Sequence, residues 1–460
     1  MKSWIWALGL VASSALAAVP FPPPEVEKLP NGLQVAWFVS DKVPVVDLGL
    51  VVESGSRWDP PGKSGTAEIL SSLLERGFDG KDATEVARQI ENLGASRYSS
   101  ADDDIMSIGL HGLASDAEKL MTYLFGMIRR PTLTREDFDR EKSRMIDRWS
   151  HLGDSVESLA GFTLGRLTAE GTPYARGSFL SLRELKAIRY EDVRDFYQSH
   201  FVPSRSILLV VGRVDLPRMR ALVRQGLESW KDVAAPPVLP KITSPRSEPG
   251  AVWLIDRPGA TQAQVRMGFT VPVLRGPDRF PLALANSALG EMFQSRLNRE
   301  LRDQQGLTYG ASSSLAYDKD LGRLFIGTST QNAKVAEVLL RTRRILADLK
   351  KNGITAEELS TAKEYLSGSF PLGLATLGSV AARWVNSKVY GLPEDDLSLY
   401  LSRLNAVTLS DANRSVRKVF PASGWSTVIA GDRKALEPIL KKAGIKNLRF
   451  RTAKDLLGQP

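Results

Sequence analysis

The chain reads Leu185-Lys-Ala-Ile-Arg-Tyr-Glu-Asp-Val193 and, 219 residues later, Leu404-Asn-Ala-Val-Thr-Leu-Ser-Asp-Ala412. The same offset takes Gly212 to Gly431 without a gap. Each copy has the pattern of a helix, a turn containing proline, a buried strand, a glycine and another helix. Chance similarity between apolar positions is the alternative. One register held across the whole stretch favours an internal duplication.

A proline-rich segment lies between the two copies. It contains Ala234-Ala-Pro-Pro-Val-Leu-Pro240 and Ser244-Pro-Arg-Ser-Glu-Pro-Gly250. Because proline restricts the backbone and removes hydrogen-bond donors, this composition predicts an extended linker at residues 234–250. The predicted domains are therefore residues 24–233 and residues 251–457.

Strands and helices are mixed within the first copy. Apolar alternation predicts strands at Leu33–Phe38, Val45–Val52 and Ile105–Leu113. Asp82-x-x-Glu85 and Thr134-x-x-Asp137 are capping patterns that open helices. Because these elements do not alternate as in a parallel βαβ sheet, the predicted fold class is α+β.

The N-terminus has the features of an export signal. Lys2 precedes an apolar run from Trp4 to Leu16, and Ala15-Leu16-Ala17 is a small-x-small cleavage pattern. We therefore expect a signal peptide at residues 1–17 and a periplasmic or secreted mature chain. The alternative is an uncleaved anchor, although the run is short for a bilayer span. No other apolar run approaches a spanning length, so we expect no membrane span in the mature chain.

The composition restricts the possible functions. The 460 residues include no cysteine, which excludes disulfides and thiolate metal sites. The formal net charge is +9, but lysine and arginine are scattered and no basic stripe is interleaved with aromatic residues. We therefore expect no nucleic-acid partner. Phosphate-binding loops, nucleophile elbows and dinucleotide fingerprints are also missing.

One helical stretch has the frame of a metal site without its ligands. Residues 65–77 read Gly-Thr-Ala-Glu-Ile-Leu-Ser-Ser-Leu-Leu-Glu-Arg-Gly. In an inverted zincin helix this frame carries His-x-x-Glu-His, and here Glu68, Ser71 and Ser72 stand at those positions. Catalytic zinc takes three protein ligands and one water, and serine is a poor neutral ligand that cannot serve as a carboxylate base. We therefore expect no metal or other cofactor in this chain.

A second stretch places Arg302 and Tyr309 seven residues apart, in Leu-Arg-Asp-Gln-Gln-Gly-Leu-Thr-Tyr. Gly306 is predicted to end the preceding helix, and residues 307–315 to continue as a strand. Arginine can hold peptide carbonyls with its planar fork, and a tyrosine hydroxyl can donate to a developing oxyanion. The apolar positions predicted to face the core from the preceding helix are Leu289, Phe293, Leu297 and Leu301.

Together these features resemble the pitrilysin/insulinase-like family of inverzincin metallopeptidases, which includes the mitochondrial processing peptidase. The resemblance covers nearly the whole mature chain. Its motifs are the frame at Gly65, the duplication, Leu29-Pro-Asn-Gly-Leu33, Gly55-Ser-Arg57 and the signature Leu301–Tyr309. It implies two tandem homologous domains, each an α/β sandwich of a mostly antiparallel sheet packed against helices. Four such domains enclose a chamber for unfolded peptides in that family, so a second chain is implied.

The resemblance also implies a division of labour. A third zinc ligand in the family lies on another helix about 75 residues downstream, where Asp147 stands here. In two-chain members one subunit carries the zinc helix and the other supplies the Arg/Tyr pair. This chain resembles the second, non-zinc-binding subunit of the two-chain bacterial type. We therefore expect a zinc-bearing paralogous partner, a peptide substrate, and Arg302 and Tyr309 as its contribution to catalysis.

Two alternatives remain at the level of sequence. A catalytically dead peptide-binding or scaffold protein with the same fold would carry the same degenerate frame. A stand-alone peptidase would require catalytic chemistry that these motifs do not contain.

Overall fold

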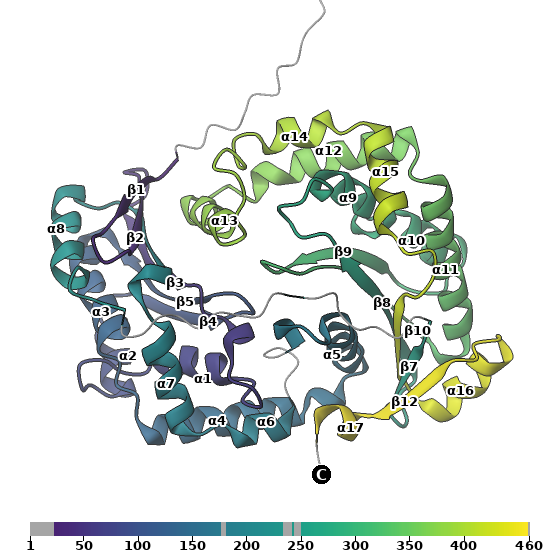
Figure 1. The fold of residues 1–460 in the computed structure, drawn as a ribbon, viewed down its shortest axis with the longest axis horizontal. Helices are drawn as coiled ribbons and strands as arrows, with labels where there is room; N and C mark the ends of the chain where they lie inside the picture. The colour runs from purple at the N-terminus through teal and green to yellow at the C-terminus, as the bar shows by residue number, and fades with distance from the viewer. Residues whose placement is uncertain (1–22, 176–180, 233–241, 243–249, 459–460) are drawn as a thin grey trace, which may run out of the picture.

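The computed structural model describes residues 23–175, 181–232, 242 and 250–458. The predicted signal peptide at 1–17 and nearly all of the predicted linker at 234–250 lie outside the described residues. The chain forms two halves, each with one six-stranded sheet (Figure 1). The predicted α+β class, with two similar domains of sheet and helices, is confirmed.

The first sheet has the strand order β1-β2-β6-β3-β5-β4. Neighbouring strands are antiparallel, apart from the parallel pair β2–β6. Its central strands are nearly continuous runs of valine, leucine and isoleucine, which suits strands that are covered on both faces. The strands are β1 (Glu25–Lys28), β2 (Gln34–Val39), β3 (Val45–Val52), β4 (Ser96–Ala101), β5 (Met106–Leu113) and β6 (Ser206–Gly212).

The second sheet has the order β12-β7-β11-β8-β10-β9, which matches the first sheet position by position. Its parallel pairs are β12–β7 and β7–β11, and the other pairs are antiparallel. Both sheets end in a hairpin, β4–β5 in one and β10–β9 in the other. The strands are β7 (Val252–Asp256), β8 (Gln262–Val271), β9 (Ala311–Tyr317), β10 (Gly322–Gln331), β11 (Ser426–Gly431) and β12 (Leu448–Thr452).

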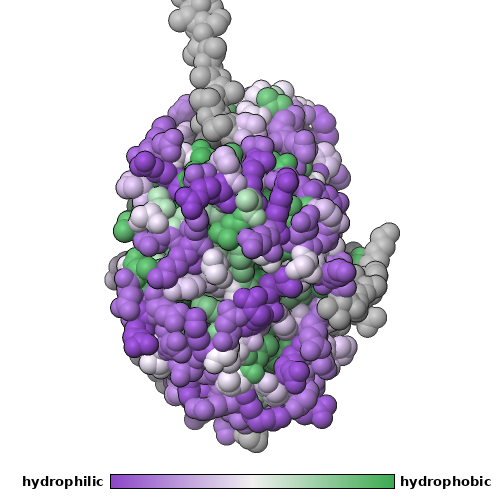
Figure 2. Space-filling model, turned by 90° about the vertical axis from the view of Figure 1, so that its left-hand side faces the viewer, coloured by the Kyte–Doolittle hydropathy of each residue, from purple (hydrophilic) through white to green (hydrophobic). Residues whose placement is uncertain are grey.

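Most helices of the first half lie on the outer side of its sheet (Figure 1). The predicted caps are present, because Asp82 accepts a hydrogen bond from the Glu85 amide and Thr134 from the Asp137 amide. These helices are α1 (Thr66–Leu74), α2 (Ala83–Glu91), α3 (Ala117–Arg129), α4 (Arg135–Ser150), α6 (Leu182–Ala187), α7 (Tyr190–His200) and α8 (Leu216–Leu227). Seen from this side, the surface is mostly hydrophilic, with apolar residues in small groups (Figure 2).

Two helices cross from one half to the other. Helix α5 (Val156–Ala169) belongs to the first half of the sequence but packs on β8 and β11 of the second sheet. Helix α13 (Leu377–Val389) makes the reverse exchange and packs on β6, with Trp384 edge-on to Phe38 at 5.8 Å between ring centroids. Both helices lie between the two sheets (Figure 1). The two halves therefore share their cores across the predicted domain boundary.

The remaining helices cover the second sheet and the C-terminal end. No helix in the described part of the chain combines the length and apolarity needed to cross a bilayer. These helices are α9 (Arg279–Asn286), α10 (Arg296–Asn298), α11 (Val335–Asn352), α12 (Ala356–Leu372), α14 (Tyr400–Ala406), α15 (Leu409–Val419), α16 (Arg433–Lys442) and α17 (Ala453–Leu457).

Candidate functional site

The degenerate metal frame lies on α1, which packs against α4 and the edge strand β4. Gly65 adopts a φ of +103° just before the helix, a conformation that favours glycine. The Asp59 carboxylate accepts hydrogen bonds from the amides of Gly65 at 2.7 Å and Ala67 at 2.8 Å. This carboxylate satisfies amides that the first turn of a helix leaves unpaired and fixes where α1 begins.

The two serines of the frame differ in burial and in the bonds that they form. The Ser71 hydroxyl is buried and donates to the Glu68 carbonyl at 2.9 Å. The Ser71 carbonyl accepts from the Ser99 hydroxyl of β4 at 2.7 Å, which ties the helix to the edge strand. Ser72 is half-buried. Neither hydroxyl can replace an imidazole ligand or a carboxylate base.

The residue that faces Glu68 from α4 is Arg148. Its Nη1 atom lies 2.8 Å from Glu68 Oε1, whereas Asp147 is exposed and forms no ion pair with a described residue. Glu141 and Met145 are buried on the same helix, and the steps from 141 to 145 and 148 keep these residues on one face. A guanidinium therefore stands where the sequence analysis placed an acidic group. Among the described residues, no group of three His, Asp or Glu side chains could hold a metal ion.

The histidines do not contribute to this frame. His111 pairs with Asp47, and His151 with Asp154. His200 is buried and stacks on Phe196 at 4.1 Å between centroids. Burial lowers the pKa of His200 to about 4, with the nearby Arg205 charge acting in the same direction. It is therefore a neutral core residue at physiological pH.

The segment before Arg302 differs from the single helix that was predicted. A π-helical turn, η7 (Ser287–Glu291), ends where Met292 becomes extended, and helical structure resumes at α10 and continues into the π-helical segment η8 (Arg299–Gln304). Because the chain leaves the helix there, Phe293 is 67% exposed and does not face the core as predicted. The Arg302 guanidinium stacks on the Phe293 ring at 4.4 Å. The other three apolar positions, Leu289, Leu297 and Leu301, are buried as predicted.

The loop that carries Tyr309 is fixed at its backbone. The Leu307 amide donates to the Leu301 carbonyl at 2.8 Å, and the Leu307 carbonyl accepts from the Thr330 hydroxyl at 2.7 Å. The predicted strand from residue 307 begins only at Ala311, because residues 307–310 form this loop. Tyr309 itself is 95% exposed. The structure thus presents the phenol to solvent on a well-anchored loop, and Arg302 contacts Phe293 and not Tyr309.

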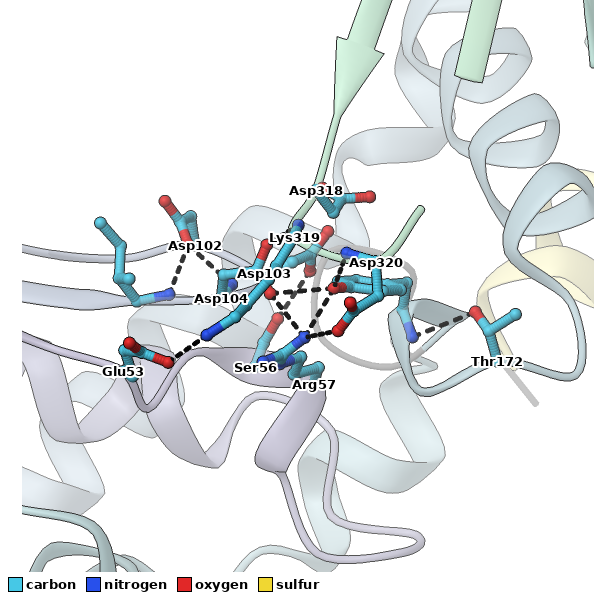
Figure 3. A network of polar contacts seen from close by, with 12 residues as sticks. Glu53, Ser56, Arg57, Asp102, Asp103, Asp104, Thr172, Asp318, Lys319 and Asp320 are labelled. Atoms are coloured by element: carbon cyan, nitrogen blue, oxygen red, sulfur yellow. Dashed lines mark hydrogen bonds and ion pairs between the residues drawn. The ribbon is translucent and has the colours of Figure 1, made fainter. Parts of the chain in front are cut away.

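A polar network that the sequence analysis missed joins the two halves (Figure 3). It lies at the tips of the β4–β5 and β9–β10 hairpins, where residues 102–104 are all aspartate and residues 318–320 read Asp-Lys-Asp. The Lys319 amide donates to Asp104 at 2.6 Å. The sequence could have indicated this network, because acidic residues cluster at the equivalent turn of each copy of the repeat.

Arg57 connects the two hairpin tips. Its buried guanidinium lies 2.9 Å from Asp104, 3.0 Å from Asp320 and 2.7 Å from the Tyr174 hydroxyl. Gly55, two residues earlier, has no room for a side chain, since a Cβ there would lie 2.3 Å from the Asp102 carbonyl oxygen. The motif Gly55-Ser-Arg57 therefore builds the contact between the halves and has no direct part in the metal frame.

Two carboxylates of this network are poorly solvated. Burial raises the pKa of Asp318 to about 7, and the neighbouring aspartates add to the shift while Arg323 opposes it. Burial also raises the pKa of Asp103 to about 6, against a hydrogen bond from Ser56. The contact between the halves therefore contains groups that titrate near neutral pH.

Comparison with known protein families gives two matches along the chain. Residues 35–165 match the model of the insulinase family, peptidase family M16, and residues 187–366 match that of the peptidase M16 inactive domain. The two ranges together cover more than half of the chain. The chain belongs to the M16 (insulinase) peptidase family.

The relatives within the M16 family carry different names. An uncharacterized zinc protease of Streptomyces coelicolor is 26% identical over 400 residues, covering 85% of this chain and 86% of that protein. The zinc protease PqqE of Helicobacter pylori is 23% identical, covering 88% and 92%. A second Helicobacter pylori protein, the non-peptidase homolog YmxG, is 21% identical, covering 85% and 90%. Similarity along most of the chain therefore does not distinguish relatives named zinc proteases from one named a non-peptidase homolog.

Solved structures show the same fold. A crystal structure of a peptidase M16 inactive domain from Pseudomonas fluorescens has a TM-score of 0.82 at 22% identity, covering 89% of this chain and 98% of that one. The crystal structure of a protease from Helicobacter pylori has a TM-score of 0.81 at 23% identity, covering 89% and 100%.

Proposed function

We propose that this chain is the exported, non-zinc-binding subunit of a two-chain M16 peptidase. In this proposal a paralogous subunit carries the zinc ion and cleaves peptides, while this chain supplies Arg302 and Tyr309. The observation that carries the proposal is the pairing of Glu68 with Arg148 at 2.8 Å, beside the two serines. A guanidinium beside Glu68 repels a divalent cation and the two serines are poor ligands, so the frame does not fit zinc and no catalytic step is assigned to it.

The exposed surface around Arg302 supports the second half of the proposal. Phe293 and Tyr309 are large aromatic side chains that are 67% and 95% exposed, so neither contributes much to the core. The backbone bonds at Leu307 anchor the loop that carries Tyr309. Exposed aromatic and arginine side chains are common where a protein contacts a partner or a peptide.

The relatives support a pairing of unlike subunits. Helicobacter pylori has one protein named a zinc protease and another named a non-peptidase homolog, and both are similar to this chain along most of its length. In this chain Glu68, Ser71 and Ser72 stand at the zinc-frame positions. A scaffold or peptide-binding protein without any proteolytic role is the alternative, and the same degenerate frame would suit it.

A reconstitution experiment tests the proposal. The mature chain would be co-expressed with a zinc-bearing M16 paralogue from the same genome, and cleavage of an unfolded peptide would be measured with and without a chelator. We expect chelator-sensitive cleavage by the pair, and neither cleavage nor bound zinc for this chain alone. About one zinc per purified chain, surviving dialysis, would overturn the proposal.

The role of Tyr309 is tested in the same complex. Tyr309→Phe should lower kcat by about 10²–10³-fold, the usual cost of losing one oxyanion donor. The melting temperature should be unchanged, because the side chain is 95% exposed. Tyr365→Phe on α12, at 43% exposed, is the matched control and should leave kcat unchanged. A complex that assembles with Tyr309→Phe and cleaves at the wild-type rate would favour the scaffold alternative.

A further inference from the structure

The second half contains a cavity of about 700 Å³ that the proposed function does not use. It is open to solvent on one side and is lined by α9, α12, α13, α14, the turn η7 and the edge strand β9. Its size lies within the range of natural small-ligand pockets. Apolar and aromatic walls are provided by Leu274, Phe280, Leu315, Leu366 and Tyr400.

This cavity occupies the place in the second half that the metal frame occupies in the first. Strands β4 and β9 hold the same edge position in their sheets. The 219-residue offset of the repeat relates α1 to α9 and η7, and α4 to α12. The cavity therefore lies between an edge strand and two helices that correspond to those around Glu68. In the second half this position is a cavity, and its side chains differ from those of the degenerate metal frame.

Two residues that line the cavity each carry a buried oxygen without a partner among the described residues. Asn286 is 2% exposed, and its Nδ2 donates to Glu291 at 3.1 Å while its Oδ1 accepts no hydrogen bond from them. The hydroxyl of Tyr317 is also buried without such a partner. Burial raises the pKa of Tyr317 to about 12, so the phenol keeps its proton and can donate. Because an unpaired buried polar group is costly, both atoms call for a hydrogen-bond partner that the described residues do not supply.

The charged residues that line the cavity differ in whether they form ion pairs. Arg279 is paired with Asp396. Arg383 instead stacks on Phe370 at 4.8 Å and forms no ion pair with a described carboxylate. Glu291 accepts hydrogen bonds from the neutral Asn286 and Ser287 side chains and forms no ion pair with a described residue. The wall thus offers one cation and one anion that are both available to a ligand.

We propose that this cavity binds amino acids or short peptides that have a free carboxylate and an apolar side chain. Arg383 and the Tyr317 hydroxyl would hold the carboxylate through charge-assisted hydrogen bonds. Asn286 Oδ1 and Glu291 would accept from the ligand's amide and amino groups. The side chain would lie against the aromatic and leucine walls. No residue of this site is Arg302 or Tyr309, so the site can be tested on the chain alone.

Calorimetry with the purified mature chain tests this inference. The probes are leucyl-leucine, its C-terminal amide and its N-acetyl derivative. We expect saturable one-to-one binding of leucyl-leucine with a Kd below about 1 mM, and binding of the amide weakened at least about tenfold because the carboxylate is lost. Acetylation should weaken binding as well, since it removes the ammonium that faces Glu291.

Two variants locate the site. Tyr317→Phe should weaken leucyl-leucine binding by about tenfold while leaving the melting temperature unchanged or higher, because the lost hydroxyl bonds no described residue. Arg383→Gln should reduce binding of the free dipeptide to that of its amide. Arg417→Gln, at an exposed arginine of α15, is the control and should bind as wild type.

The outcomes are decisive in either direction. Absence of saturable binding, equal binding of the acid and the amide, or wild-type affinity in Tyr317→Phe would overturn the inference. If Arg383→Gln fails to fold, Tyr317→Phe carries the test by itself. None of these results bears on the cleavage assay, so failure here would leave the proposed peptidase role standing.

Discussion

At the scale of single residues, Arg148 decides what the degenerate frame can bind. Its guanidinium lies 2.8 Å from Glu68 Oε1, so positive charge already occupies the neighbourhood of the would-be ligands. Asp147, one position earlier, is exposed. One residue turns a helical side chain by about 100°, which is enough to carry it off the face that meets α1.

This geometry predicts how the frame could be restored. The triple change Glu68→His, Ser71→Glu and Ser72→His should bind zinc at least about tenfold more tightly when combined with Arg148→Glu than with Asp147→Glu. The reason is that Arg148→Glu both removes a cation and places a carboxylate opposite residue 68. Zinc titration with a competing chelator measures the difference. Equal affinity of the two quadruple variants would show that Arg148 does not face the ligand positions.

Neither quadruple variant should reach the turnover of an intact zinc peptidase. An active zinc site also needs neighbouring groups that hydrogen-bond to the zinc ligands and orient them. The Ser99 hydroxyl does not do this, because it bonds the backbone carbonyl of Ser71. The sequence was sufficient to place Glu68, Ser71 and Ser72 on one helix, because their spacing is local. It was insufficient to choose between positions 147 and 148, since spacing across two helices depends on how the helices pack.

At the scale of elements, the exchange of α5 and α13 could not be read from the sequence. An amphipathic pattern shows that one face of a helix is buried, but it does not show against which sheet. The same limit applies to Phe293, whose four-residue spacing is correct for a helix that the chain leaves at Met292. By contrast, the helix caps at Asp82 and Thr134 depend only on neighbouring residues and were predicted correctly.

The exchanged helix α13 gives a stability prediction. Trp384→Ala should destabilise the whole protein by about 3–5 kcal/mol, the usual cost of truncating a buried tryptophan. Trp384 is 9% exposed and packs on Phe38 of the other half. Chemical denaturation followed by circular dichroism gives the free energy of unfolding. Leu372→Ala, at a residue that is 77% exposed on α12, is the control, and a similar loss there would argue against a specific role of the exchange.

At the scale of the whole molecule, the contact between the hairpin tips makes stability depend on pH. The pKa of Asp318 is raised to about 7 in the folded protein, above its ordinary value of 3.8. The folded state therefore binds more protons than the unfolded chain between these values, and stability rises as the pH falls through 7. Asp103, with a pKa of about 6, acts in the same direction.

We expect the unfolding free energy of the wild type to gain on the order of 1 kcal/mol from Asp318 between pH 8 and pH 6. Asp318→Asn should flatten this dependence, because the amide does not titrate. The slope with pH is the informative quantity, since removing the charge that pairs with Arg323 also changes the absolute stability. Asp411→Asn is the control, as the pKa of that exposed group is lowered and it titrates well below this range. An equally steep slope in Asp318→Asn would contradict the prediction.

The shared cores also predict that neither half folds alone. A fragment ending at residue 232 would keep its first sheet but lose α13, exposing Ala36, Phe38 and Val51 of that sheet to water. It would also retain α5 without the second sheet against which Leu159 and Leu164 pack. Both losses remove apolar burial that offsets the conformational entropy of folding. We expect the fragment to lack a cooperative thermal transition and to regain one when co-expressed with residues 250–458. A fragment that unfolds cooperatively by itself would show that the exchanged helices dock on cores that are already complete.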